Sequence, residues 1–337
     1  VVETGDIVYT KSPLKSNPYG IIKANKGKNG IVSTLYAVYK PKQSANPEFV
    51  QIYFEQDARM NNYMHPLVNK GAKNDMKVSA ENALKGQIVF PDIKEQRTIS
   101  EFFHNLDTLI TLHQRKYEKL VNIKKSMLDK MFPKNGASVP EIRFKGFTDP
   151  WEQRKLGEIA KEVVRNDPAS DAPIMMITAG NGFIEQSDRY AFNNAGESLK
   201  KYILLERGEL AYNHGASKLR PYGSCFALTT VEKARIPFVY HCFSVEKSNP
   251  EFLSIELNGA NVENQLRKIV SSGARMDGLL NIAYSEYTEV TVQLPKKEEQ
   301  DWIAKFFKHL DTLITLHQRK LEKLQNIKKS CLEKMFV

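Results

Sequence analysis

Cysteine is scarce in this chain of 337 residues. Cys225, Cys242 and Cys331 form no C-x-x-C pair, so their spacing argues against a disulfide framework and against a zinc ribbon. So few cysteines fit a reducing compartment, and we expect a cytoplasmic protein. No apolar run approaches the ~18 residues of a membrane span, so we expect neither a transmembrane helix nor a signal peptide.

Catalytic signatures are also missing. The sequence has no G-x-x-x-x-G-K-[ST] phosphate loop, no H-E-x-x-H, no G-x-S-x-G, and no Asn or Asp before paired prolines, as an amino-methyltransferase would show. Pro91-Asp92 could open a nuclease motif, but no acidic-x-Lys follows, and the corresponding Pro295-Lys296 lacks the acid. We therefore expect a chain that is not an enzyme, holds no metal, and acts by recognition.

A modest excess of positive charge points to the kind of partner. The 49 lysines and arginines outnumber the 39 acidic residues, giving a net charge of +10 and a pI of about 9.2. Such an excess favours nucleic acid or a membrane surface, although a basic protein without an anionic partner has the same composition. The length and the hydrophobic fraction of 41% are typical of a globular protein with two or three domains.

The most informative feature is a duplication. Residues 106–116 read LDTLITLHQRK, and residues 310–320 read the same. Between 101–132 and 305–336, 25 of 32 residues are identical at an offset of 204. Solenoid repeats have periods of about 20–50 residues, so this offset indicates two whole modules that end in the same helix. Such a chain is expected to bind two copies of a partner or to read two halves of one target.

The segments before the two helices share only a skeleton. Short motifs recur at offsets of 203 or 204, namely Glu3-Thr4-Gly5-Asp6 with Glu206-Arg207-Gly208-Glu209, Pro18-Tyr19-Gly20 with Pro221-Tyr222-Gly223, Asn46-Pro47-Glu48-Phe49 with Asn249-Pro250-Glu251-Phe252, and Glu95-Gln96 with Glu299-Gln300. Near-identical helices suggest one common partner, and divergent segments suggest two different targets. Residues 137–203 have no counterpart before Val1, so we expect a first module with open strand edges and exposed apolar surface.

Each duplicated segment is predicted to be one long amphipathic helix. Apolar residues recur at steps of three and four over 97–131 and over 302–335, and at 1.5 Å per residue each helix spans about 50 Å. A narrow stripe on so long a helix requires a partner helix, and its duplicate is the obvious one. The histidines on the stripe are expected to be interface residues. The predicted helix-pair interface comprises Phe102, Leu106, Leu109, His113, Leu120, Phe306, Leu310, Leu313, His317 and Leu324.

The remainder of the second module predicts an α+β domain. Runs rich in β-formers, bounded by turn residues, cover 174–177, 225–228, 238–245 and 290–294, whereas 250–257 and 262–270 have helical patterns. Residues 137–150, which proline and glycine interrupt, are predicted to be a linker.

Two basic loops with Gly and Pro are candidates for contact with DNA. One covers 212–223, with a counterpart at 10–20, and the other covers 271–275, with a counterpart at 69–73. Arginine can read guanine with two hydrogen bonds and lysine more often meets phosphate, although either loop could be an ordinary solvated turn. The predicted DNA-binding residues are Lys11, Lys15, Tyr19, Lys73, Asn213, Lys218, Arg220, Tyr222 and Arg275.

Three segments are characteristic in combination: LPKKEEQDWIAKFFKHLDTLI at 294–314, FPDIKEQRTISEFFHNLDTLI at 90–110 and PEIRFKGFTDPWEQRKLGEI at 140–159. With these segments, the chain resembles, over essentially its whole length, the specificity (S) subunit of type I restriction–modification enzymes. The resemblance implies two α+β target-recognition domains separated by two long conserved helices that pack as an antiparallel coiled coil. Its domains would be 1–96 and 151–300, its spacer helices 97–133 and 301–337, and its linker 134–150.

The resemblance also implies a function. Each recognition domain would read one half of a split double-stranded DNA target, and the helices would set the gap and dock two modification (methyltransferase) subunits. Those partners would hold S-adenosylmethionine, separate restriction (motor-nuclease) subunits would use ATP and Mg²⁺, and the specificity subunit itself would bind no cofactor and do no chemistry.

The chain departs from the family pattern in its first recognition domain, which lacks the counterpart of 137–203. Since the chain starts at Val1 instead of Met, the expectations left open are a fragment, a naturally truncated subunit, or a module completed by a second chain. The alternatives are the specificity half of a fused methyltransferase–nuclease, and a scaffold whose coiled coil is its whole function.

Overall fold

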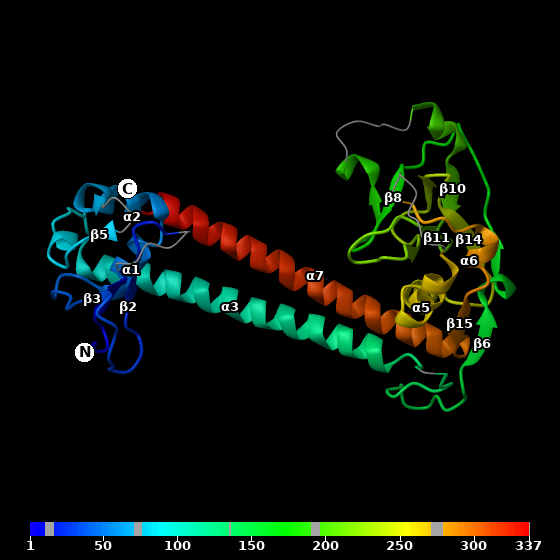
Figure 1. Ribbon diagram of the computed structural model, residues 1–337, viewed down its shortest axis with the longest axis horizontal. Coiled ribbons are helices and arrows are strands. Elements are labelled where there is room, and N and C mark those ends of the chain that lie inside the picture. Colours follow the sequence, from blue (N-terminus) through cyan, green and yellow to red (C-terminus); the bar gives the residue numbers. More distant parts are fainter. Residues whose placement is uncertain (11–16, 71–75, 135, 190–195, 271–278, 337) are drawn as a thin grey trace. The chain divides into compact units, whose positions relative to one another are not determined.

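The computed structural model describes residues 1–10, 17–70, 76–134, 136–189, 196–270 and 279–336. The chain forms two compact units, one of residues 1–119 and 314–337 and one of residues 120–313. Two helices of 38 residues, α3 (Ile93–Lys130) and α7 (Lys297–Lys334), are shown in Figure 1. One part of each helix belongs to the first unit and the other part to the second. Helices and strands occur in both units, as the predicted α+β class requires.

The first unit is built on an antiparallel sheet of three strands in the order β2-β1-β3. Its core includes Tyr9, Phe54, Met60 and Met64, which lie between the sheet and the helices that follow it. The elements before α3 are β1 (Ile7–Thr10), β2 (Ile21–Ala24), β3 (Tyr36–Tyr39), α1 (Pro47–Tyr53), α2 (Asp57–Met64), η1 (His65–Leu67), β4 (Asn69–Lys70), β5 (Met76–Lys77) and η2 (Asn82–Leu84).

The second unit has a four-stranded sheet in the order β12-β11-β14-β7 and three two-stranded sheets, β10-β13, β15-β6 and β8-β9. Two clusters of buried side chains fill it, one that includes residues of the long helices and one among β8, β10, β11, β13 and β14. Its elements are β6 (Glu152–Lys155), η3 (Leu156–Glu158), β7 (Ala160–Glu162), β8 (Met175–Thr178), β9 (Gly182–Glu185), η4 (Gln186–Asp188), η5 (Gly196–Lys201), β10 (Ile203–Glu206), β11 (Leu210–Asn213), β12 (Ser224–Ala227), β13 (Lys233–Ile236), β14 (His241–Val245), α4 (Pro250–Leu257), α5 (Ala260–Ile269), α6 (Tyr284–Tyr287) and β15 (Thr291–Leu294).

The repeated sequence motifs form the same local structures in both units. Asn46 and Asn249 cap α1 and α4 by accepting from the backbone N–H groups of Phe49 and Phe252 at 2.9 and 3.0 Å. The N–H of each asparagine in turn donates at 2.8 Å to a buried glutamine of the long helix, Gln96 or Gln300. These glutamines join the start of each long helix to the module that precedes it.

The long helices begin earlier than the apolar stripe predicted. The expected starts at 97 and 302 are wrong, because the first turns carry mainly polar residues, some of them buried, that no hydrophobic pattern reveals. Asp92 caps the N-terminus of α3, because its Oδ1 accepts from the N–H groups of Lys94 and Glu95 at 2.8 and 2.9 Å.

The short elements expected in the second module are present, with shifted bounds for most. β8, β12, β14 and β15 overlap the four predicted β-rich runs, and α4 covers the whole predicted helix. Among the described helices, none combines the length and the apolarity that a membrane span requires.

Candidate nucleic-acid interface

A hydrogen bond from a tyrosine hydroxyl joins the two ends of the loop between β11 and β12, and the same bond occurs in the first unit. The Tyr212 hydroxyl donates to the Tyr222 carbonyl at 2.6 Å, and the Tyr9 hydroxyl donates to the Tyr19 carbonyl at 2.8 Å. The next residue in each loop is a glycine with positive φ, Gly223 at 82° and Gly20 at 81°. A Cβ on Gly223 would lie 2.6 Å from the Asn213 carbonyl oxygen, so the turn requires glycine.

Two predicted DNA-binding residues of this loop make hydrogen bonds within the protein. Asn213 donates to the Ile177 carbonyl at 3.1 Å and accepts from the Gly215 N–H at 2.9 Å. The guanidinium of Arg220 donates to the Asn258 carbonyl at 2.6 Å, and burial lowers the pKa of Arg220. Both side chains therefore shape the loop, and the exposed Lys218 lies at its tip.

Arg267 and His214 belong to this region but were not assigned a role from the sequence. The Arg267 guanidinium lies 5.8 Å from the ring centre of Tyr222, which places an exposed cation beside the loop. The ring nitrogens of the buried His214 lie 2.8 Å from the carbonyl oxygens of Leu280 and Val239. His214 thereby joins three segments of the second unit, and no local sequence signal distinguishes it from other histidines.

Five predicted DNA-binding residues lie in other segments of the chain. Tyr19 is half-buried, with its ring edge-on to His65 at 6.3 Å. Lys11, Lys15, Lys73 and Arg275 lie outside the described residues.

In the first unit, the two helix segments run antiparallel. Phe103 lies near Phe336, Asp107 binds Lys328, and further along α3 the Nδ1 atoms of His113 and His317 are 2.8 Å apart. One imidazole must donate and the other accept, so at least one ring is neutral. Burial, His113, Lys116 and Lys320 all lower the pKa of His317.

Equivalent contacts recur in the second unit with the two copies exchanged. Phe132 packs against Phe307, and Lys124 binds Asp311. Each of these four residues lies 204 positions from its counterpart in the contacts Phe336–Phe103 and Lys328–Asp107 of the first unit. Among the other predicted interface residues, Leu106 and Leu310 are buried, whereas Leu120, Phe306, Leu313 and Leu324 are half-buried. Phe306 packs against Phe144.

Two of the predicted interface residues of α3 are exposed. Phe102 and Leu109 are 40% and 43% exposed, whereas the adjacent Phe103 is fully buried and Ile110 is half-buried. The sequence has apolar residues at both neighbouring positions, so spacing could not determine which of them faces inward. The stripe of α3 is displaced by one residue at these positions.

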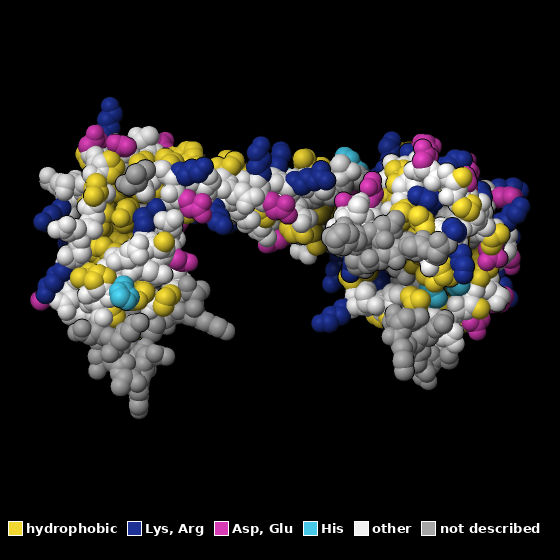
Figure 2. Space-filling view, turned by 90° about the horizontal axis from the view of Figure 1, so that it is seen from above, with side chains coloured by type: hydrophobic (Ala, Val, Ile, Leu, Met, Phe, Trp, Pro, Cys, Tyr) yellow, Lys and Arg dark blue, Asp and Glu magenta, His cyan; other side chains and the backbone are white. Residues whose placement is uncertain are grey.

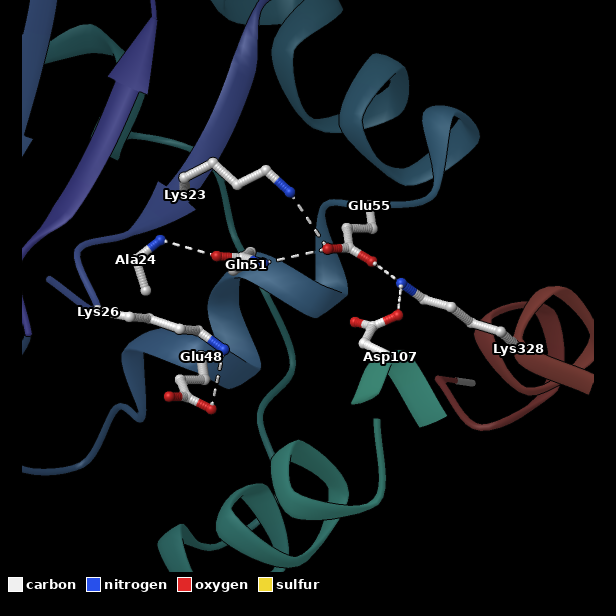
Figure 3. Close-up of polar contacts among 8 residues, drawn as sticks. All are labelled: Lys23, Ala24, Lys26, Glu48, Gln51, Glu55, Asp107 and Lys328. Carbon is white, nitrogen blue, oxygen red and sulfur yellow. Dashed lines mark hydrogen bonds and ion pairs between the residues drawn. The ribbon is translucent and has the colours of Figure 1, made fainter. Parts of the chain in front are cut away.

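Lys328 is bound more extensively than its duplicate Lys124. In Figure 3 its ammonium lies between Asp107 and Glu55, at 2.8 and 2.9 Å. Glu55 also pairs with Lys23 and accepts from Gln51. Burial alone would lower the pKa of Lys328, but the two carboxylates outweigh it and raise that pKa. This network fastens α7 to α3 and to the module of the first unit.

The helix surfaces carry charges of both signs (Figure 2). Figure 2 shows Lys and Arg side chains along the helices with Asp and Glu among them, so the surface there has mixed sign. Within the described ranges, no three His, Cys, Asp or Glu side chains gather as a metal site would require.

No family model matches the sequence. Among solved structures, the S subunit of a type I restriction-modification system from M. genitalium matches all of this chain and 84% of its own length, with 12% identity and a TM-score of 0.60. The HsdS subunit of Thermoanaerobacter tengcongensis (16% identity, 81% of its length, TM-score 0.46) and a chain from a structure of type I R-M complex assembly (15%, 82%, 0.45) also match all of this chain. The M. genitalium match shows that this chain has the fold of a type I restriction-modification S subunit.

Proposed function

We propose that this chain is the non-catalytic DNA-specificity subunit of a type I restriction–modification enzyme. The observation that carries the proposal is the duplication, in which near-identical helices follow modules that share short motifs but differ in most of their sequence. The basic net charge and the S-subunit fold support it. A protein that read one symmetric target would have no use for two different modules.

In this proposal, each module reads one half of a split duplex target. Lys218, Tyr222 and Arg267 surround the loop of the second module, where an exposed lysine and an exposed arginine can meet phosphates or base edges. Asn213 and Arg220 hold that loop in shape. Tyr19 and the loop lysines Lys11, Lys15 and Lys73 would act in the first module, and Arg275 in the second.

The helices would have a separate task. Their apolar stripes and the exchanged contacts, Lys328 with Asp107 and Lys124 with Asp311, favour an antiparallel coiled coil. Such a pair would set the gap between the half-targets. Because α3 and α7 present nearly the same surface, they would dock two methyltransferase subunits, which would hold S-adenosylmethionine, whereas restriction subunits would use ATP and Mg²⁺.

Mapping of methylated adenines tests this proposal. Cells that express the chain with its methyltransferase partner should methylate a motif of two short specific blocks separated by a fixed, non-specific gap. Cells with the partner alone should lack that motif. A contiguous motif, or the same methylation without this chain, would contradict the proposal.

A further inference from the structure

The loop between β11 and β12 ends in a motif that both copies contain and that differs at two positions. Residues 218–223 read KLRPYG, and residues 15–20 read KSNPYG. The lysine and the Pro-Tyr-Gly turn are the same in both, whereas Leu219-Arg220 stands in one copy and Ser16-Asn17 in the other. If the two modules read different half-targets, the part of that difference that lies in this motif must come from these two positions.

Of the two variable positions in the second unit, one turns inward and the other outward. The guanidinium of Arg220 donates to the Asn258 carbonyl at 2.6 Å, and its side chain is half-buried. Leu219, in contrast, is 64% exposed. An exposed leucine leaves unused the free energy that burial of its apolar surface would give. Leu219 is therefore the variable residue of the motif that is open to a ligand.

The main chain that carries Leu219 is held in a tight turn. The Ser217 N–H donates to the Arg220 carbonyl at 3.0 Å, and the Arg220 N–H donates to the Ser217 hydroxyl, also at 3.0 Å. At the start of the loop, the Asn213 side-chain amide donates to the Ile177 carbonyl of β8. Because the turn is already ordered, a contact made by Leu219 does not first require ordering of the loop.

The surroundings of Leu219 are polar and basic. The exposed Lys218 precedes it, and the exposed Arg267 guanidinium lies beside the ring of Tyr222 in the same loop. A Cβ on Gly180 would lie 3.7 Å from the Cδ2 of Leu219, so the exposed turn between β8 and β9 lies next to this leucine. An apolar side chain thus projects close to cations that can bind phosphates.

The chemistry of leucine limits what it can recognise on DNA. Its side chain neither donates nor accepts hydrogen bonds, whereas most groups on the base edges of the major groove do one or the other. The apolar group on those edges is the 5-methyl group of thymine, which apolar side chains contact. The corresponding Ser16 has a hydroxyl, which suits hydrogen bonding instead.

We propose that Leu219 is a specificity-determining residue of the second module and contacts the 5-methyl group of a thymine in the major groove. The proposal rests on the proposed DNA function and assigns one base of one half-target. Lys218 and Arg267 would bind the flanking phosphates, and the contact between leucine and methyl group would select the base.

Deoxyuridine, which differs from thymidine only by lacking this methyl group, tests the proposal. The probe is the duplex with the split motif that mapping of methylated adenines defines, and each thymine in it is replaced in turn. For the chain with its methyltransferase partner, we expect one replacement, in one block, to weaken binding about 3- to 10-fold. For the Leu219→Ala chain, the same replacement should weaken binding by less than about 2-fold, because the contact is already lost.

Two variants serve as controls. Leu219→Met keeps an apolar side chain of similar volume and should keep the dependence on the methyl group. Leu84→Ala removes a leucine that is 61% exposed outside the loop, and should also keep it.

Three results would overturn the proposal. Binding of the split target with no dependence on any thymine methyl, or with a dependence that Leu219→Ala retains in full, would overturn it and leave the proposed function intact. Equal weakening of the thymine and deoxyuridine duplexes by Leu219→Ala would show a contact other than the methyl group. The absence of any split target would contradict the proposed function, and this proposal with it.

Discussion

At the scale of single residues, the buried glutamines Gln96 and Gln300 join the start of each long helix to the preceding module. The Gln96 amide donates to the carbonyls of Ser44 and Pro91 at 3.0 and 2.9 Å and accepts from the Asn46 N–H. Gln96→Met keeps the volume but leaves those groups without a partner. We expect the free energy of unfolding to fall by about 2–3 kcal/mol, measured by urea denaturation. Gln318→Met, on an exposed surface of α7, should change it by less than about 0.5 kcal/mol, and equal losses would contradict the assigned role.

The Lys328 network predicts a second, pH-dependent effect. Burial would raise the pKa of Glu55, but Lys328, Lys23 and Gln51 outweigh it and hold that pKa below 4.5. The Glu55 carboxylate therefore stabilises the fold above about pH 4.5, and this contribution is lost as the pH falls through the folded-state pKa. Lys328→Met should cost about 1–2 kcal/mol at pH 7 and less near pH 3, measured by urea denaturation at both pH values.

Lys124→Met is the matched control for that variant. Lys124 occupies the duplicate position, and its partner Asp311 is 53% exposed. Removing this more exposed pair should cost under about 1 kcal/mol. A larger loss for Lys124→Met than for Lys328→Met would show that Glu55 does not strengthen the network.

At the scale of elements, Leu106 and Leu109 of α3 differ in burial although they lie only three positions apart. Leu106 is 7% exposed and belongs to a cluster with Phe49 and Phe103, whereas Leu109 is 43% exposed. Leu106→Asp places a charge in that cluster and should destabilise the first unit by more than about 3 kcal/mol. Leu109→Asp should cost less than about 1 kcal/mol. Thermal unfolding followed by circular dichroism compares the two, and the reverse order would show that the stripe faces elsewhere.

How much of each element the sequence predicts depends on its length. Over most of their 38 residues, the repeated apolar spacing indicates α3 and α7 clearly, and the Asn-Pro-Glu-Phe motif indicates α4. Strands of four residues, such as β10 and β13, have too few side chains to show a period and depend on pairing across 30 residues of chain. For the candidate site, composition could point to the loop around Lys218, but the inward turn of Arg220 depends on the Asn258 carbonyl, a tertiary contact.

At the scale of the whole molecule, the proposed division of labour predicts that the two half-targets can be altered separately. Each unit has its own buried core, so a change on a loop of the second should leave the first intact. The Lys218→Ala/Arg267→Ala variant removes two exposed cations beside that loop. With its methyltransferase partner, it should bind the split target about 10- to 100-fold more weakly, with a shallower dependence on salt.

Selection of bound sequences from a randomised duplex library locates the effect within the target. The variant should lose base preference in one block while the other block and the gap length stay the same, because the helices and the first module are unchanged. Lys145→Ala, which removes an exposed lysine from the linker, should bind as the unaltered chain does. Equal weakening of both blocks, or none, would show that the loop at Lys218 does not read a half-target.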